Sequence, residues 1–98
     1  MNIIQTTETF DNWYEQLRDR RASARIAMRI DRAEDGNFGD SEPVGEGVSE
    51  MRIHYGPGYR VYYKFVGRQI VILLAGGDKS SQKQDIKTAL ELARQLKE

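Results

Sequence analysis

Residues 48–78 read VSEMRIHYGPGYRVYYKFVGRQIVILLAGGD and carry the patterns of three β-strands. Residues 48–55 and 59–66 alternate between apolar and polar side chains, which indicates strands with one buried face. The turn residues Gly56-Pro57-Gly58 separate these two segments. Residues 69–75 are apolar almost throughout, so we expect a central strand that is buried on both faces.

Helical patterns lie on both sides of these strands in the sequence. Residues 2–5 form a short β-compatible segment, and a second helix is predicted over about residues 22–33. A first helix buries Phe10, Trp13, Tyr14 and Leu17, and a last helix begins at a capping box of Ser81 and Gln84. The order β-α-α-β-β-β-α predicts an α+β fold, in which a mostly antiparallel four-stranded sheet is packed by helices on one face.

Composition limits the kinds of site that the chain can hold. Its 98 residues suffice for one domain, residues 1–98, with a modest core. The absence of cysteine excludes disulfides and thiolate metal sites, and one histidine leaves little for a metal centre, so we expect no metal and no cofactor. The longest apolar run, residues 70–75, is far shorter than the roughly 20 residues of a membrane helix. Residues 1–5 show no signal peptide, so we expect a soluble cytoplasmic protein with no membrane partner.

The charge of the chain is zero in total but uneven along the sequence, with 15 basic and 15 acidic side chains. Residues 33–50 carry six acidic side chains and no basic one, and residues 36–47 are expected to form an irregular, mobile loop. Before this acidic segment, five arginines recur at intervals of three or four residues, which would place them on one face of a helix: Arg18, Arg21, Arg25, Arg29 and Arg32. This stripe is either a solvated surface or a surface that contacts phosphates, as in RNA.

Polar side chains of two neighbouring strands are predicted to share one face of the sheet. If Met51, Ile53, Val61, Tyr63 and Phe65 face the helices, the opposite face presents Glu50, Arg52, His54, Arg60, Tyr62 and Lys64. This mixture of cationic, aromatic and ionisable groups does not help a core, but it suits a phosphodiester. Tyr62 is expected to stack on a base or simply to face solvent, and Lys64 to contact RNA.

Four glycine-containing blocks carry a resemblance to a known family. They read GNFGD (residues 36–40), PVGEGVSEMRI (43–53), GPGYRVYY (56–63) and GGDKSSQ (76–82). The chain resembles addiction-module killer proteins, the phage-derived HigB-like branch of the RelE/ParE toxin superfamily. The resemblance implies the toxin of a type II toxin–antitoxin pair and, for RelE- and HigB-type members, cleavage of mRNA on the ribosome. It also implies a HigA-like helix-turn-helix antitoxin, often encoded by the adjacent gene.

The resemblance also implies site residues. Arg60 matches the arginine that RelE-type toxins use on the scissile phosphate, Arg52 falls near a functional lysine of the preceding strand, and Lys79 falls close to the basic residue after the last strand. A C-terminal tyrosine of RelE-type members has no counterpart, and Asp85 falls near its place. His-Tyr and Asp-Tyr-His endings of some relatives are absent as well.

Metal-independent cleavage by the neighbouring 2′-hydroxyl needs a base, cations for the phosphoryl oxygens and an acid for the leaving oxygen. Arg52, Arg60 and Lys79 are the candidate cations. His54, Asp78 and Asp85 are the candidate acid or base, although His54 can equally be structural and each aspartate can cap a helix. Glu50 is expected to pair with Arg52 or a lysine.

Two other functions fit the same sequence. A ParE-type toxin keeps the fold but inhibits DNA gyrase by contact, and a degenerate toxin only binds its antitoxin. The paired arginines beside a histidine favour the nuclease over the gyrase inhibitor, since a contact inhibitor has no need of them. The antitoxin is expected to cover either the groove beside Arg52 and Arg60 or the arginine-striped helix.

Overall fold

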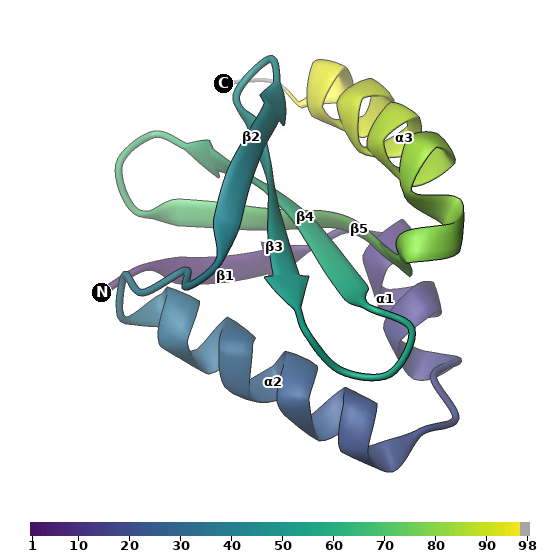
Figure 1. Cartoon of the computed structure of the whole chain (residues 1–98). Coiled ribbons are helices and arrows are strands. Elements are labelled where there is room, and N and C mark those ends of the chain that lie inside the picture. Colours follow the sequence, from purple (N-terminus) through teal and green to yellow (C-terminus); the bar gives the residue numbers. More distant parts are fainter. Residues whose placement is uncertain (97–98) are drawn as a thin grey trace.

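Five strands form one sheet, and α-helices pack against both of its faces (Figure 1). The computed structural model describes residues 1–96. Its elements are β1 (Ile3–Thr6), α1 (Glu8–Glu15), α2 (Arg20–Glu34), β2 (Ser41–Gly45), β3 (Val48–Ile53), β4 (Tyr59–Val66), β5 (Ile70–Asp78), the 3₁₀ turn η1 (Lys79–Ser81) and α3 (Gln82–Gln95). None of the helices in residues 1–96 is long and apolar enough to cross a membrane.

The strand order is β1-β5-β4-β3-β2, with β1 parallel to β5 and every other pair antiparallel. The predicted α+β class and mostly antiparallel sheet are therefore confirmed. The predicted number of four strands is wrong, because β2 forms within the segment expected to be an irregular loop. A tight turn at Glu46-Gly47 folds β2 back onto β3, and both residues have positive φ. Backbone pairing thus orders an acidic segment that has no periodicity of its own.

Each face of the sheet has its own hydrophobic cluster. Phe10 and Ile26 bring α1 and α2 against side chains of β3, β4 and β5 on one face. Ala89 and Ala93 bring α3 against the other face, where Val48 and Tyr62 are fully buried. The expectation that helices cover a single face is wrong, because the apolar stripe of α3 also needs a partner and the second sheet face supplies it.

An irregularity in the β4–β5 ladder lets two consecutive residues of β5 face α3. Tyr62 pairs with Ala75 whereas Tyr63 pairs with Leu73, so Leu74 is an additional residue in β5. Leu73 belongs to the cluster on the α1–α2 side, whereas Leu74 and Ala75 both belong to the cluster under α3. Strand β5 also continues to Asp78, beyond the two glycines that were expected to end it.

Two adjacent glycines at the end of β5 allow helices to approach from opposite faces. Gly76 lies under Trp13 of α1, where a Cβ would be 2.2 Å from the indole ring. Gly77 lies under Asp85 of α3, where a Cβ would be 1.8 Å from Oδ2. At Gly76 the indole ring leaves no room for a Cβ, whereas at Gly77 a Cβ would have to displace the end of the Asp85 side chain; neither glycine has positive φ.

The contact at Gly76 gives a test of this packing. Gly76→Ala is expected to lower the free energy of unfolding by about 1–3 kcal/mol, because the indole of Trp13 must be displaced. Urea denaturation of the variant measures the loss. In a Trp13→Ala background the same substitution should cost less than half as much, and an undiminished cost would place the strain elsewhere.

Candidate active site

Pairing of β3 with β4 places Arg52 directly opposite Arg60. Both side chains line a cavity of about 160 Å³, which His54 and Lys79 also line. Strand β3 supplies Arg52, β4 supplies Arg60, and the turn after β5 supplies Lys79. The structure thus brings four of the six predicted catalytic residues to one hollow. The other two, Asp78 and Asp85, lie outside it.

A buried carboxylate joins the two arginines. Glu50 is 2% exposed, and its Oε2 accepts a hydrogen bond from Arg52 Nε at 3.1 Å. Its Oε1 lies 3.5 Å from Arg60 Nε, which makes an ion pair without hydrogen-bond geometry, and accepts from Gln82 Nε2 at 3.2 Å. The sequence predicted an ion pair for Glu50 but not its bridging position, because Gln82 and Arg60 meet it only through the packing of α3 and β4.

The guanidinium of Arg52 is paired on all three of its nitrogens. Besides the Nε bond to Glu50, Nη2 donates to Glu42 Oε2 at 2.7 Å and Nη1 lies 3.8 Å from Asp40 Oδ1. The hydrogen bonds to Glu50 and Glu42 raise the pKa of Arg52 above its usual value. Both β2-side acids come from the segment expected to be a mobile loop. An anion that approaches Arg52 would therefore compete with these carboxylates.

Arg60 and Lys79 keep positive charge available to the cavity. Beyond its pairing with Glu50, Arg60 donates only a long bond from Nη1 to the carbonyl of Gly58 at 3.3 Å. Lys79 is exposed, and no residue in the described range forms an ion pair or hydrogen bond with its side-chain ammonium. An anion in the cavity would therefore lie beside a partly buried guanidinium and an exposed ammonium.

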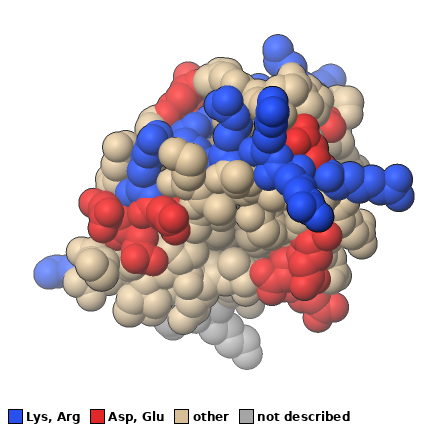
Figure 2. All heavy atoms as spheres, turned by 90° about the horizontal axis from the view of Figure 1, so that it is seen from below, with Lys and Arg blue, Asp and Glu red and all other residues tan. Residues whose placement is uncertain are grey.

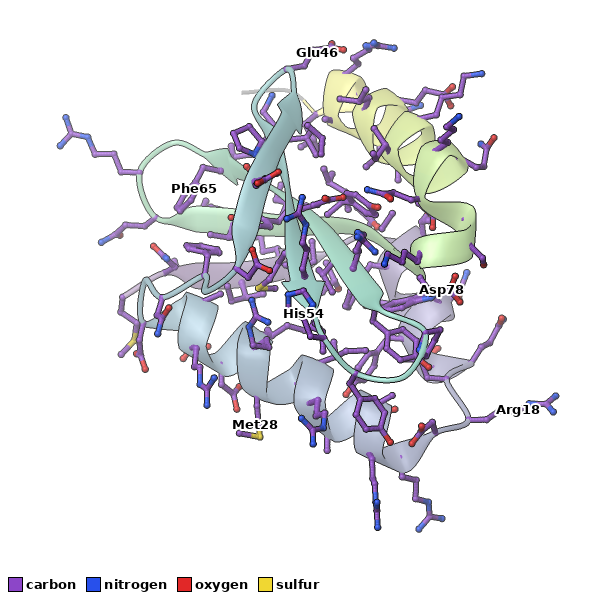
Figure 3. The ribbon with its side chains drawn as sticks, viewed as in Figure 1. Arg18, Met28, Glu46, His54, Phe65 and Asp78 are labelled. Carbon is purple, nitrogen blue, oxygen red and sulfur yellow. The ribbon has the colours of Figure 1, made fainter. Side chains whose placement is uncertain are left out.

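His54 stands at the rim of the cavity with 74% of its side chain exposed (Figure 3). Its Nε2 lies 2.5 Å from Asp40 Oδ2, and this contact holds the pKa of the Asp40 carboxyl below its usual range. The carboxylate of Asp40 thus orients the His54 imidazole at Nε2, while most of the ring remains in solvent. This is an arrangement in which a histidine can exchange a proton with a bound ligand.

The two aspartates near the start of α3 accept hydrogen bonds from neighbouring serines. Asp78 caps η1 by accepting from the backbone N–H of Ser80 at 2.8 Å, and its bonds with Ser80 lower its pKa. Asp85 accepts from Ser81 Oγ at 2.5 Å and covers Gly77. The predicted capping box is wrong, because the Ser81 side chain bonds to Asp85 and makes no cap hydrogen bond.

The predicted RNA-contacting residues of β4 do not face a common groove. Tyr62 has no exposed surface, since α3 covers it, and burial raises the pKa of its hydroxyl. The prediction that Tyr62 stacks on a base or faces solvent is therefore wrong. Lys64 pairs with Val48 at the opposite end of the strand from Arg60 and lies beside Gly47.

Arginines of α2 line a second, larger hollow. Arg21, Arg25, Arg29 and Arg32 line an open groove of about 650 Å³ together with Met28 and His54. Figure 2 looks at the molecule from the side of α2 and shows a band of Lys and Arg side chains, with acidic groups on either side. The prediction that Arg18 shares this stripe is wrong, because it lies in the link between α1 and α2 and points away from the body of the protein (Figure 3).

Two of the groove arginines also hold the structure together. Arg29 donates to the carbonyl oxygens of Arg52 and Phe38, the latter at 2.9 Å, and its burial lowers its pKa. Arg25 stacks over the ring of Tyr55 with its guanidinium carbon 4.7 Å from the ring centroid. The arginine stripe is therefore partly structural. The sequence pattern predicted a solvated surface or a phosphate-contacting surface, but not contacts within the protein.

Comparison with known proteins identifies the family. The family described as "Phage derived protein Gp49-like (DUF891)" matches residues 12–98. The chain belongs to this family. It is the family of RelE/HigB-like addiction-module toxins. A Haemophilus influenzae protein described only as an uncharacterized protein is 53% identical over 93 residues, which cover 95% of this chain and 94% of that protein.

The family assignment gives the site context without assigning its chemistry. The Gp49-like family is associated with the toxins of toxin–antitoxin systems. Blocks 36–40, 43–53, 56–63 and 76–82, on which the resemblance depends, all lie within the matched residues. They contribute Asp40, Arg52, Arg60 and Lys79 to the neighbourhood of the small cavity.

Glu50 and Glu42 both pair with Arg52, but Glu50 also pairs with Arg60. We therefore expect the loss of Glu50 to lower the free energy of unfolding more than the loss of Glu42. Glu50→Ala should lower the free energy of unfolding by about 3–5 kcal/mol, because it leaves charged arginines partly buried without their carboxylate. Glu42→Gln should cost less than about 1 kcal/mol, because Glu42 is 61% exposed. Thermal and urea unfolding measure both, and equal costs would contradict the bridging role.

Proposed function

We propose that this chain is the toxin of a type II toxin–antitoxin pair and that it cleaves mRNA on translating ribosomes without a metal ion. The observation that carries the proposal is the pair of cations, Arg60 and Lys79, that faces a small cavity at the β3–β4 turn. The family supports the toxin role. A HigA-like helix-turn-helix antitoxin is the proposed partner, with the ribosome and mRNA as targets.

The proposed reaction is attack of a 2′-hydroxyl oxygen on the adjacent phosphorus. The P–O bond to the 5′-oxygen breaks, the 2′-hydroxyl loses its proton to a base, and the leaving oxygen gains one from an acid, so the products carry a 2′,3′-cyclic phosphate and a 5′-hydroxyl. Negative charge grows on the non-bridging oxygens, where Arg60 and Lys79 stabilise it. Removal of one such donor typically costs about 10²–10³ in rate.

The acid–base role falls to His54 in this proposal. It is the exposed titratable side chain at the rim of the cavity, and Asp40 orients its Nε2. Asp78 and Asp85 are less suited, because their carboxylates already accept hydrogen bonds from Ser80 and Ser81. Arg52 contributes once a phosphate replaces Glu42 on its exposed nitrogens.

The complete pairing of Arg52 favours a second candidate function. A non-catalytic toxin, whether a ParE-type inhibitor of DNA gyrase or a degenerate toxin that only binds its antitoxin, needs no free guanidinium at this position. In such a protein the Arg52 ion pairs with Asp40, Glu42 and Glu50 would serve only to hold β2 against β3. The two candidates differ in whether mRNA is cut.

The nuclease proposal is tested by inducible expression in a bacterial host, with growth and mRNA 5′ ends followed together. Wild type should arrest growth and produce new 5′ ends within translated codons. Arg60→Ala should abolish both while the protein stays folded, because the main cation of the cavity is lost. Arg68→Ala, an exposed arginine in the β4–β5 turn, is the matched control and should behave as wild type.

Three outcomes would contradict this version of the function. Growth arrest with intact messages and accumulated gyrase–DNA cleavage complexes would establish the ParE-type alternative. No growth arrest would indicate the degenerate toxin. Cleavage that survives Arg60→Ala would place the site elsewhere on the molecule.

The pairing of Arg52 predicts that Glu42 competes with RNA. Glu42→Gln should tighten binding of a labelled, non-cleavable 2′-O-methyl RNA by about 1.4- to five-fold, because an exposed ion pair of roughly 0.2–1 kcal/mol no longer has to be broken. Fluorescence anisotropy measures the affinity. Glu46→Gln removes the same charge from the β2–β3 turn, where Glu46 pairs with Arg94, and should change binding less. Equal effects would show a general charge effect instead.

A further inference from the structure

The outer face of α2 combines exposed apolar side chains with arginines. Arg21, Ala24, Arg25, Met28 and Arg32 occupy positions i, i+3, i+4, i+7 and i+11, so they share one side of the helix. Met28 is 52% exposed, one of the few large hydrophobic side chains that the described residues leave in solvent. Ile53 and His54 at the end of β3 line the same groove, which measures about 650 Å³. The groove thus has an apolar floor and a cationic rim.

The positive charge of this rim is only partly balanced by neighbouring groups. Among residues 1–96, no carboxylate lies within ion-pair distance of Arg21, Arg25 or Arg32, although Asp19 interacts with Arg21 electrostatically and the Tyr55 ring lies under Arg25. This contrasts with Arg52, whose three nitrogens all face carboxylates. These three guanidinium groups lack carboxylate partners, and they therefore favour a ligand that carries acidic groups.

The shape and chemistry of the groove favour a protein helix over RNA. Phosphates need cations but gain nothing from an exposed thioether, whereas an apolar stripe on a ligand helix can cover Met28. Ala24 is small and allows close approach of a second helix, one turn before Met28. Arg21 and Arg32 are eleven residues apart on α2, or roughly 16 Å, which about three turns of a ligand helix would match.

We propose that the α2 groove is a docking site for an amphipathic α-helix of a partner protein, with apolar residues over Ala24 and Met28 and carboxylates against Arg21, Arg25 and Arg32. The inference rests on the proposed function, since an antitoxin is the partner that would supply this helix. It adds the surface and the chemistry that such a partner must present.

A helix docked in the α2 groove would also affect the small cavity, because the two hollows share lining residues. Ile53 and His54 line both hollows, so a helix in the groove reaches the edge of the cavity that holds Arg60 and Lys79. A docked helix would cover His54 without contacting either cation. Neutralisation of the toxin would then follow from loss of access to the candidate acid–base group.

The test uses the full chain and two fluorescein-labelled 14-residue peptides of identical composition. One places leucines on one helical face and glutamates on the flanks, and the other scrambles the order. Anisotropy should show at least about tenfold tighter binding of the amphipathic peptide, and amide shifts in a ¹⁵N–¹H spectrum should cluster on α2 and Ile53–His54. Equal affinity of the two peptides, or shifts away from α2, would overturn the proposal.

Paired variants distinguish peptide binding in the groove from a general effect of net charge on peptide affinity. Arg21→Glu should weaken peptide binding at least about tenfold, whereas Arg20→Glu, which makes the same charge change on the neighbouring residue outside the groove, should weaken it less than about twofold. Met28→Ala should weaken the peptide about fivefold and leave binding of an oligouridine RNA unchanged. Circular dichroism checks that each variant is folded.

Two results would overturn the docking site and leave the nuclease proposal standing. If Met28→Ala has no effect while oligouridine displaces the peptide, the groove is a polyanion surface that fits RNA. If Arg20→Glu and Arg21→Glu weaken binding equally, the effect is one of net charge. Neither measurement uses RNA cleavage or growth, so an absence of Arg60-dependent cleavage would in turn leave the docking result intact.

Discussion

A carboxylate buried between two guanidinium groups is the interaction on which the candidate site depends. The β3–β4 register sets Arg52 directly opposite Arg60, and like charges in that position repel. Glu50 lies two residues before Arg52 on the same face and pairs with both, while Gln82 of α3 satisfies the same carboxylate. Without this acid, the sheet would carry two adjacent, largely buried positive charges, which is costly in a low-dielectric environment.

The same carboxylate makes the two arginines unequal. Arg52 extends toward β2, where Asp40 and Glu42 complete its pairing, so it helps to hold the edge strand. Arg60 lines the cavity with Lys79, and the ion pair that the described residues form with Arg60 is the one with Glu50. The zero net charge of the chain therefore hides local differences: three carboxylates surround Arg52, whereas no described residue forms an ion pair with Lys79. An anionic ligand responds to these local differences, not to the sum.

Two hollows of different size meet at the end of β3. The small cavity is lined by Arg52, Arg60 and Lys79, and the larger α2 groove by arginines and Met28, with Ile53 and His54 common to both. The backbone around this junction is held by Arg29, which donates to carbonyls of Arg52 and Phe38. A ligand in either hollow would therefore lie beside Ile53 and His54, which also line the other hollow.

The sequence by itself determined the α+β class, the three strands of residues 48–78 and the proximity of Arg52 and Arg60, because alternation and turn residues are local signals. It did not reveal β2, since that strand forms through pairing with β3 rather than through its own periodicity. Only the tertiary structure decided that Tyr62 is buried and that Glu50 bridges two arginines. Both depend on α3 packing against the second face of the sheet, and contacts between residues so far apart in the chain leave no pattern in the sequence of either partner.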